Sequence, residues 1–199
     1  MAMDLDARVR QFSPATAHSQ PVRDLFNNVP TAVTALCAVV EGVPRGLVAT
    51  SLSVGVSFEP PMVAFSVVSS SRTWPHLRAA RRIGVSVLSD QQAEACRQIA
   101  SKTGDRFVGL DVATTGDRAL FIGGAASWMD CSIADVTVAG DHELVLLQIH
   151  RVHSSTAAEP LVFHRSDFRR LEAPKPREAP GASVAGSLTR SSQGVSHGR

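Results

Sequence analysis

The stretch GLVATSLSVGVSFEPPMVAFSVVSSSRTW, residues 46–74, decides how the chain is interpreted. Two apolar runs rich in β-branched residues, 46–56 and 62–68, flank the paired prolines Pro60 and Pro61. Valine, threonine and phenylalanine fit a pleated surface and the proline pair interrupts it, so each run is predicted to be a strand. The stretch therefore predicts a fold built mainly from β-strands.

Hydroxyl side chains lie inside these apolar strands, at Thr50, Ser51, Ser53, Ser57 and Ser66. A buried hydroxyl without a partner costs roughly 1–3 kcal/mol, so a polar group is expected to meet them. Two interpretations are open. The hydroxyls bond to neighbouring strands, or they contact the planar polar ring of a ligand.

A second polar cluster, SSSRT at residues 69–73, ends the second strand. It precedes a predicted short helix whose apolar face holds Trp74, Leu77 and Ala80. Hydroxyls, free backbone N–H groups and a guanidinium at a helix N-terminus form an anion site, and phosphate is its usual occupant. A ligand ring over the first cluster can place a phosphate tail at the second.

The rest of the chain also predicts short strands with few helices. In order, we expect a helix from Val22 that Pro30 ends, a hairpin through 32–56, a strand at 83–88, a helix capped by Asp90, a polar connection at 111–120, and strands at 125–138 and 142–152 joined by a Gly140-Asp141 turn. Such a pattern is typical of a closed antiparallel barrel.

Composition limits the classes of function. The 199 residues carry a formal charge of +2, and the segment from residue 174 onward contributes +3, which leaves −1 for the rest. A body near neutrality lacks the basic field that nucleic acids require, so we expect no nucleic-acid partner. No run approaches the roughly 20 apolar residues of a membrane span, so no membrane association is expected either.

The chain is divided into one folded domain and two segments without predicted structure. Residues 1–19 are expected to be a flexible N-terminal segment without the apolar core of a signal peptide, and residues 20–172 the folded domain. Residues 173–199 hold no aromatic residue and are rich in Gly, Pro and Ser, which predicts disorder.

The cysteines and histidines predict neither disulfides nor a metal site. Cys37, Cys96 and Cys131 are odd in number and widely spaced, which favours core residues in a cytoplasmic protein. On a strand, His150 and His153 point to opposite faces, so a metal site is not expected. The chain contains no G-x-G-x-x-G dinucleotide motif, which does not exclude NADH binding on an open face.

Several segments in a fixed order resemble the flavin reductase-like, FMN-binding split-barrel family. They are the opening stretch, VRDLFNNVPTAVTAL at 22–36, IGVSVL at 83–88, Asp105-Arg106-Phe107, Gly140-Asp141-His142, PLVF at 160–163 and FRRL at 168–171. The likeness covers about residues 20–172, and it rests on the order and spacing of the motifs more than on any single one.

The resemblance implies a fold, an activity and a set of partners. The fold would be a split β-barrel with a few peripheral helices, present as a homodimer with the flavin at the subunit interface. The activity would be that of an NAD(P)H-dependent flavin reductase, which binds FMN or FAD and transfers hydride from the nicotinamide to flavin N5. Reduced flavin would pass to a separate monooxygenase. FMN versus FAD, and NADH versus NADPH, stay open.

The resemblance, together with the two polar clusters, also selects candidate site residues. His142 would orient the nicotinamide nucleotide, with Asp141 fixing its tautomer. The candidate flavin-binding residues are Thr50, Ser51, Leu52, Ser53, Gly55, Ser70, Ser71, Arg72, Thr73, Trp74, Lys102, Arg106 and Phe107.

Two of these assignments carry alternatives. Residues 46–60 are one longer than the commoner family spacing, so a β-bulge near Val54-Gly55 is expected and the register at residues 50–53 is open by one position. In the loop at 105–107, Lys102 or Arg106 would face the flavin; alternatively, Asp105 pairs with Arg106 while Phe107 anchors the loop.

Two other functions are compatible with the same residues. One is a flavin-binding electron carrier that does not turn over NAD(P)H. The other is a flavin-dependent oxygenase that acts on its own organic substrate.

Overall fold

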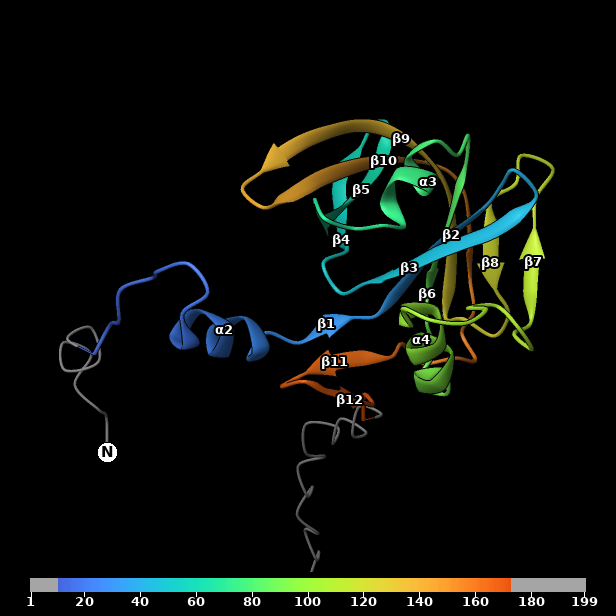
Figure 1. Cartoon of the computed structure of the whole chain (residues 1–199). Helices are drawn as coiled ribbons and strands as arrows, with labels where there is room; N and C mark the ends of the chain where they lie inside the picture. Colours follow the sequence, from blue (N-terminus) through green and yellow to red (C-terminus); the bar gives the residue numbers. More distant parts are fainter. Residues whose placement is uncertain (1–10, 173–199) are drawn as a thin grey trace, which may run out of the picture.

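The computed structural model describes residues 11–172 (Figure 1). The predicted tail and the first ten residues of the predicted N-terminal segment lie outside the described residues. Residues 11–19 carry no helix or strand.

Within residues 11–172, three short helices and a series of antiparallel strands make up the fold. The helices are α2 (Gln20–Asn27), α3 (Trp74–Arg78) and α4 (Ala93–Ala100). The strands are β1 (Thr31–Ala32), β2 (Thr34–Val40), β3 (Val43–Ala49), β4 (Ser53–Phe58), β5 (Pro61–Val68), β6 (Ile83–Val87), β7 (Val112–Thr114), β8 (Leu120–Ile122), β9 (Ser127–Ala139), β10 (His142–Ser154), β11 (Val162–His164) and β12 (Asp167–Arg169).

The main sheet has seven strands in the order β3-β2-β6-β9-β10-β5-β4, and it curves into a barrel (Figure 1). Its edge strands β3 and β4 are consecutive in the chain, and residues 50–52 cross between them. There the Ser51 hydroxyl accepts the N–H of Ser66 on β5 at 2.9 Å and donates to its carbonyl at 3.0 Å. Side-chain bonds thus bridge the split where no strand pairing closes it.

Two apolar cores lie on opposite faces of β2, because alternate side chains of a strand point to opposite sides. Leu36 and Ala38 face the barrel interior with Phe65 and Leu147. Val33, Ala35 and Cys37 face the outer core, which α4, β8 and Leu161 cover. Burial on both faces explains why β2 reads as a continuous apolar run.

Most of the predicted elements are confirmed. The hairpin turn at Gly140-Asp141 is present with Ala139 opposite His142, and Gly140 has a positive φ of 65°. The expected bulge lies between Ser53 and Ser57, with Gly55 at φ 70°. The predicted mainly-β split barrel with few peripheral helices is therefore confirmed.

Four local predictions are wrong. Residues 46–56 are not one strand, because the chain leaves β3 at residue 50 to cross the split. The helix predicted to carry Ala80 on its apolar face, α3, ends before that residue, at Arg78. Asp90 does not cap α4, because the N-cap of that helix is Gln92. The Asp90 carboxylate instead lies 3.4 Å from Nε of Arg170. The connection at 111–120 includes strand β7, which pairs with β8.

Among the described residues, no helix combines the length and the apolar character needed to cross a membrane.

Candidate functional site

A hollow of about 410 Å³ lies where the end of β5, strand β3 and the end of α4 meet. Its lining combines apolar side chains of the strands with hydroxyls and cations of the loops. The residues are Leu47, Val48, Val68, Ser70, Ser71, Arg72, Thr73, Ile99, Ala100, Lys102 and Arg106. The hollow therefore brings together the predicted residues 70–73 and two predicted cations from a separate loop.

The serine-rich segment, residues 69–73, is held in place by hydrogen bonds to neighbouring backbone groups. Ser69 N–H donates to the carbonyl of Asp141 at 3.0 Å, and Ser71 N–H donates to the carbonyl of Val68 at 2.9 Å. The Ser71 hydroxyl accepts the N–H of Trp74 at 3.2 Å, at the start of α3. These bonds fix the turn and leave Ser70 and Arg72 exposed at the hollow.

Arg106, on the loop after α4, bonds both to strand β3 and to the segment before α3. One guanidinium nitrogen donates to the carbonyl of Gly46 at 3.0 Å and to the hydroxyl of Thr73 at 2.9 Å. Phe107 packs against the outer core, as predicted. The Asp105 carboxylate accepts the N–H of Phe107 at 2.9 Å, so the alternative in which Asp105 pairs with Arg106 is wrong.

Gly46 has a role that sequence reasoning missed. A Cβ at this position would lie 2.7 Å from both Cys37 Sγ and Phe107 Cζ. Only glycine lets the loop pack this closely on β3, and its carbonyl then receives Arg106. The available signal was its place at the start of an apolar strand, where a missing side chain indicates close approach of another segment.

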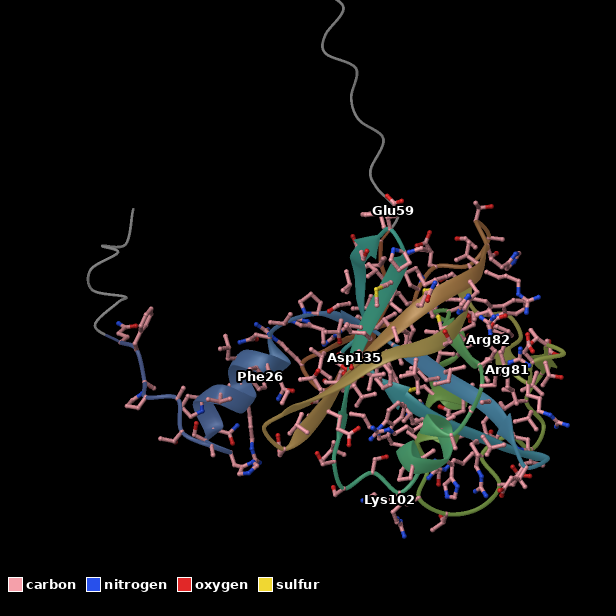
Figure 2. All side chains as sticks on the ribbon, turned by 90° about the horizontal axis from the view of Figure 1, so that it is seen from above. Phe26, Glu59, Arg81, Arg82, Lys102 and Asp135 are labelled. Atoms are coloured by element: carbon pink, nitrogen blue, oxygen red, sulfur yellow. The ribbon has the colours of Figure 1, made fainter. Side chains whose placement is uncertain are left out.

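One wall of the hollow, formed by Ser70, Arg72, Thr73, Lys102 and Arg106, carries positive charge. Within residues 11–172, no carboxylate oxygen lies within 4.0 Å of the cationic groups of Arg72, Lys102 or Arg106, although other arginines form such pairs. Lys102 lies at the periphery of the molecule, on the loop after α4 (Figure 2). Unpaired cations beside hydroxyls suit an anionic group such as phosphate.

The first hydroxyl cluster is divided by the crossing segment. The Ser51 hydroxyl bonds to the backbone of Ser66, which agrees with the interpretation that these hydroxyls bond to neighbouring strands. Leu52 packs against the barrel core, while Thr50, Ser53 and Gly55 are exposed. None of these five lines the hollow, although Thr50 follows two residues after Val48, which does.

Trp74 is not brought into the hollow. Its side chain is 3% exposed, meets Phe65 edge to face, and donates from Nε1 to the Glu143 carboxylate at 2.8 Å. The structure therefore assigns the tryptophan ring to the core.

His142 and Asp141 lie beside the hollow and not in its lining. His142 opens β10 directly opposite Val68, so both side chains stand on the same face of the sheet, and Val68 lines the hollow. Nδ1 of His142 lies 2.8 Å from Oδ1 of Asp141, the predicted pairing. The hydrogen bond from His142 holds the pKa of the exposed Asp141 carboxyl below its ordinary value.

The three cysteines are free and buried, and none lines the hollow. Burial raises the pKa of all three thiols, that of Cys131 to about 12. A buried thiol with a raised pKa is a poor nucleophile, which agrees with their predicted place in the core.

A second hollow of about 710 Å³ adjoins the first and shares Arg72, Thr73, Lys102 and Arg106 with it. It also contains Arg45 and His76, which the sequence did not single out. His76 could have been noticed as the polar residue two positions after Trp74 in α3.

Comparisons with known proteins identify the family of the chain. The model of the flavin reductase like domain family matches residues 26–172. A flavin reductase from Pseudomonas putida is 34% identical over 147 residues, which cover 73% of this chain and 86% of the relative. The reductase subunit of a flavin-dependent monooxygenase from Mycobacterium tuberculosis is 30% identical over 155 residues, covering 77% of this chain and 82% of the relative.

Solved structures agree with this assignment. Nitrilotriacetate monooxygenase component B from Mycobacterium thermoresistibile superposes with a TM-score of 0.75 at 27% identity, over 85% of this chain and 95% of that chain. An NADH:FAD oxidoreductase from Streptomyces globisporus gives a TM-score of 0.72 at 29% identity, over 81% of this chain and 99% of that chain. The chain therefore belongs to the flavin reductase like domain family, which confirms the resemblance and the predicted class of enzyme, a flavin-reducing oxidoreductase.

Proposed function

We propose that the chain is the NAD(P)H-dependent flavin reductase component of a two-component system and that the smaller hollow holds the flavin phosphate. The observation that carries this proposal is the convergence of Ser70, Arg72 and Thr73 with Lys102 and Arg106 on one wall. Three of these residues, Arg72, Lys102 and Arg106, are cations that the described part of the chain leaves without a carboxylate. A phosphate would complete their coordination.

The donor set fits a phosphorylated flavin in both charge and surroundings. Leu47, Val48 and Val68 give the hollow an apolar side next to the cations. A flavin phosphate combines an anionic end with a largely apolar ring system, and this pairing of surfaces matches it. Arg106 would support the phosphate indirectly as well, because its bond to the Thr73 hydroxyl sets the position of that side chain.

A bound flavin supplies an acceptor for the hydride of the nicotinamide. His142 would contact the nicotinamide nucleotide on the same sheet face as Val68, and its bond with Asp141 favours the tautomer with the proton on Nδ1 and Nε2 free to accept. The contribution of these two residues is to position the reacting atoms, since alignment alone supplies much of the rate in such transfers.

The expected partners extend this proposal. One relative is named as the reductase subunit of a flavin-dependent monooxygenase, which supports release of reduced flavin to a separate oxygenase. We also propose the homodimer that the resemblance implies and a cytoplasmic location. Edge strand β4 exposes Val54, Val56 and Phe58, the last at 89%, and an exposed apolar edge favours association. Light scattering would show a dimer that Phe58→Glu converts to monomer; a monomeric parent protein would contradict this part.

The test is an assay of nicotinamide oxidation. The purified chain is mixed with NADH or NADPH and with FMN or FAD, and the nicotinamide absorbance is followed against a control without protein. Oxidation above the control is expected with at least one pair. Tight flavin retention without oxidation would favour an electron carrier, and no oxidation with any pair would overturn the proposal.

A matched pair of variants tests the site within this assay. Arg72→Ala removes a cation of the hollow, whereas Arg81→Ala removes an arginine whose side chain is 82% exposed elsewhere. The first should raise the flavin concentration needed for half-maximal rate by about tenfold, the loss expected for one charge-assisted bond. The second should leave it unchanged, and equal effects would move the phosphate away from this wall.

A further inference from the structure

Glu143 is a charged residue in an otherwise apolar row of β10. Alternate residues of a strand share a face, so Glu143 stands in one row with Val145 and Leu147, which are fully buried in the barrel interior. The Glu143 side chain is only 20% exposed. A largely buried carboxylate is costly unless it is hydrogen-bonded, so its bonding partners indicate what it contributes.

The Glu143 carboxylate bonds to two residues of α3, the short helix close to β5 and β10 (Figure 1). The indole Nε1 of Trp74 donates to Oε2 of Glu143 at 2.8 Å, and Nη1 of Arg78 lies 3.4 Å from the same oxygen. Trp74 and Arg78 are four residues apart and therefore lie on one side of the helix. An isolated helix of five residues is unstable in water, so these bonds and the buried Leu77 determine where α3 sits.

The position of α3 matters for the smaller hollow because the helix begins directly after the polar segment 69–73. The Ser71 hydroxyl accepts the backbone N–H of Trp74 at 3.2 Å. Arg72 and Thr73, the two residues before Trp74, line the hollow. A displacement of Trp74 would therefore carry these two side chains away from their places in the wall.

The polar segment is attached to the start of β10 at both of its ends. Ser69 N–H donates to the carbonyl of Asp141 at 3.0 Å, and Trp74, just after the segment, bonds to Glu143. His142 lies between these two attachment points in the chain. The segment that lines the hollow and the histidine beside it are thus held as one unit.

We propose that Glu143 is a positioning residue for the flavin phosphate, which holds Arg72 and Thr73 in place through the indole of Trp74. Glu143 lines neither of the two hollows, so it acts through Trp74 and not by contact with the ligand. The half-exposed Arg78 adds little, as is usual for ion pairs in contact with solvent. This inference rests on the proposed function, because it requires the phosphate to bind in the smaller hollow.

The ratio of the affinities for FMN and riboflavin isolates this role, since only FMN carries the phosphate. Glu143→Ala should lower the preference for FMN about fivefold and leave the affinity for riboflavin unchanged. Glu94→Ala is the matched control, because this carboxylate is 88% exposed and pairs with Arg97 on α4. It should leave the preference at the parent value. An equal loss of affinity for both flavins in Glu143→Ala would indicate a merely structural role and overturn the proposal.

Two further variants identify the bond responsible. Glu143→Gln keeps an oxygen that accepts the indole N–H and should retain the preference for FMN. Trp74→Phe keeps an aromatic ring in the core but removes the donor, and it should lower the preference about fivefold. Equal losses in Glu143→Gln and Glu143→Ala would overturn the assignment to the indole bond.

The double variant Glu143→Ala, Trp74→Phe completes the cycle. It should lose no more of the preference than either single variant, because both substitutions remove the same bond. It leaves neither the indole N–H nor the carboxylate without a partner, so it measures the effect even if Glu143→Ala alone does not fold. Additive losses would contradict action through Trp74.

The two proposals fail in different ways. A parent protein without a preference for FMN over riboflavin refutes the phosphate site and the positioning role together. A parent protein that loses its preference in Arg72→Ala but keeps it in Glu143→Ala and Trp74→Phe refutes the positioning role alone.

Discussion

Two segments rich in serine and threonine, 50–53 and 69–73, have similar composition and different fates in the fold. In the first, the Ser51 hydroxyl exchanges two hydrogen bonds with the backbone of Ser66 and bridges the split of the barrel. In the second, the backbone holds the turn, and Ser70 and Arg72 line a hollow beside Lys102. The hydroxyl between two strand edges thus serves the fold. Beyond the strand end, Ser71 and Thr73 also bond to Trp74 and Arg106, whereas the Ser70 hydroxyl is exposed at the hollow.

The largest expected effect concerns Gly46 on β3, where the loop that carries Arg106 packs closely. Gly46→Ala places a methyl group 2.7 Å from Phe107 and Cys37, which should lower the free energy of unfolding by about 1–3 kcal/mol. The loop that carries Arg106 would shift with Phe107, so flavin affinity should fall as well. Chemical denaturation and flavin titration measure both quantities.

Gly116→Ala is the control for this prediction, because a Cβ there meets nothing within 4 Å. If Gly46→Ala leaves both stability and flavin affinity at the parent values, the close packing of this loop on β3 is needed for neither.

The second prediction tests the two segments separately, with one serine substitution in each. Ser51→Ala should destabilise the fold by about 1 kcal/mol, because two backbone groups of Ser66 lose a partner that water only partly replaces. Ser70→Ala should leave stability within about 0.5 kcal/mol and weaken FMN binding several-fold. The reverse pattern, with Ser70 needed for stability and Ser51 for flavin, would refute the comparison.

Much of this fold could be predicted from the sequence, for physical reasons that the structure makes visible. The β-branched runs and the Gly140-Asp141 turn determine strands and a hairpin locally, and both are present. The break at residues 50–52 could not be predicted, because it depends on the distant backbone of Ser66. Periodicity likewise assigned Trp74 to a buried face, while the resemblance placed it at the flavin.

The site was predictable only in part. Residues 70–73 were identified from hydroxyls and a guanidinium at a strand end, a local signal. Gly46 and Arg45 escaped notice because their roles arise from the loop after α4, which packs on β3 some 60 residues away in the chain, the separation of the Arg106–Gly46 bond. Contacts between remote segments leave no mark in local pattern.

The third prediction concerns the residues that neighbour the second segment across the sheet. His142→Ala should slow nicotinamide oxidation about tenfold and leave flavin affinity unchanged, because His142 lies outside the hollow lining. His150→Ala on the same strand is the control, since His150 bonds to Ser132 away from the hollow. Steady-state kinetics decide the matter, and an unchanged rate would remove His142 from the site.

The smallest effect is a titration. The bond from His142 lowers the pKa of Asp141, so the pairing stabilises the fold above the unfolded-state pKa and is lost as pH falls through the lower folded-state pKa. Carboxyl NMR should show the Asp141 pKa rising toward its ordinary value in His142→Ala. The carboxylate is 71% exposed, so little change in overall stability is expected. An equal pKa in both proteins would show that the pairing does not persist in solution.

The most direct measurement compares the affinities of FMN and riboflavin, which differ only by the phosphate. The parent protein should bind FMN at least about tenfold more tightly than riboflavin, and the double variant Arg72→Ala, Lys102→Ala should bind both with nearly equal affinity. If the parent protein binds the two flavins equally well, or if the double variant keeps the full preference for FMN, the phosphate does not sit at the end of β5.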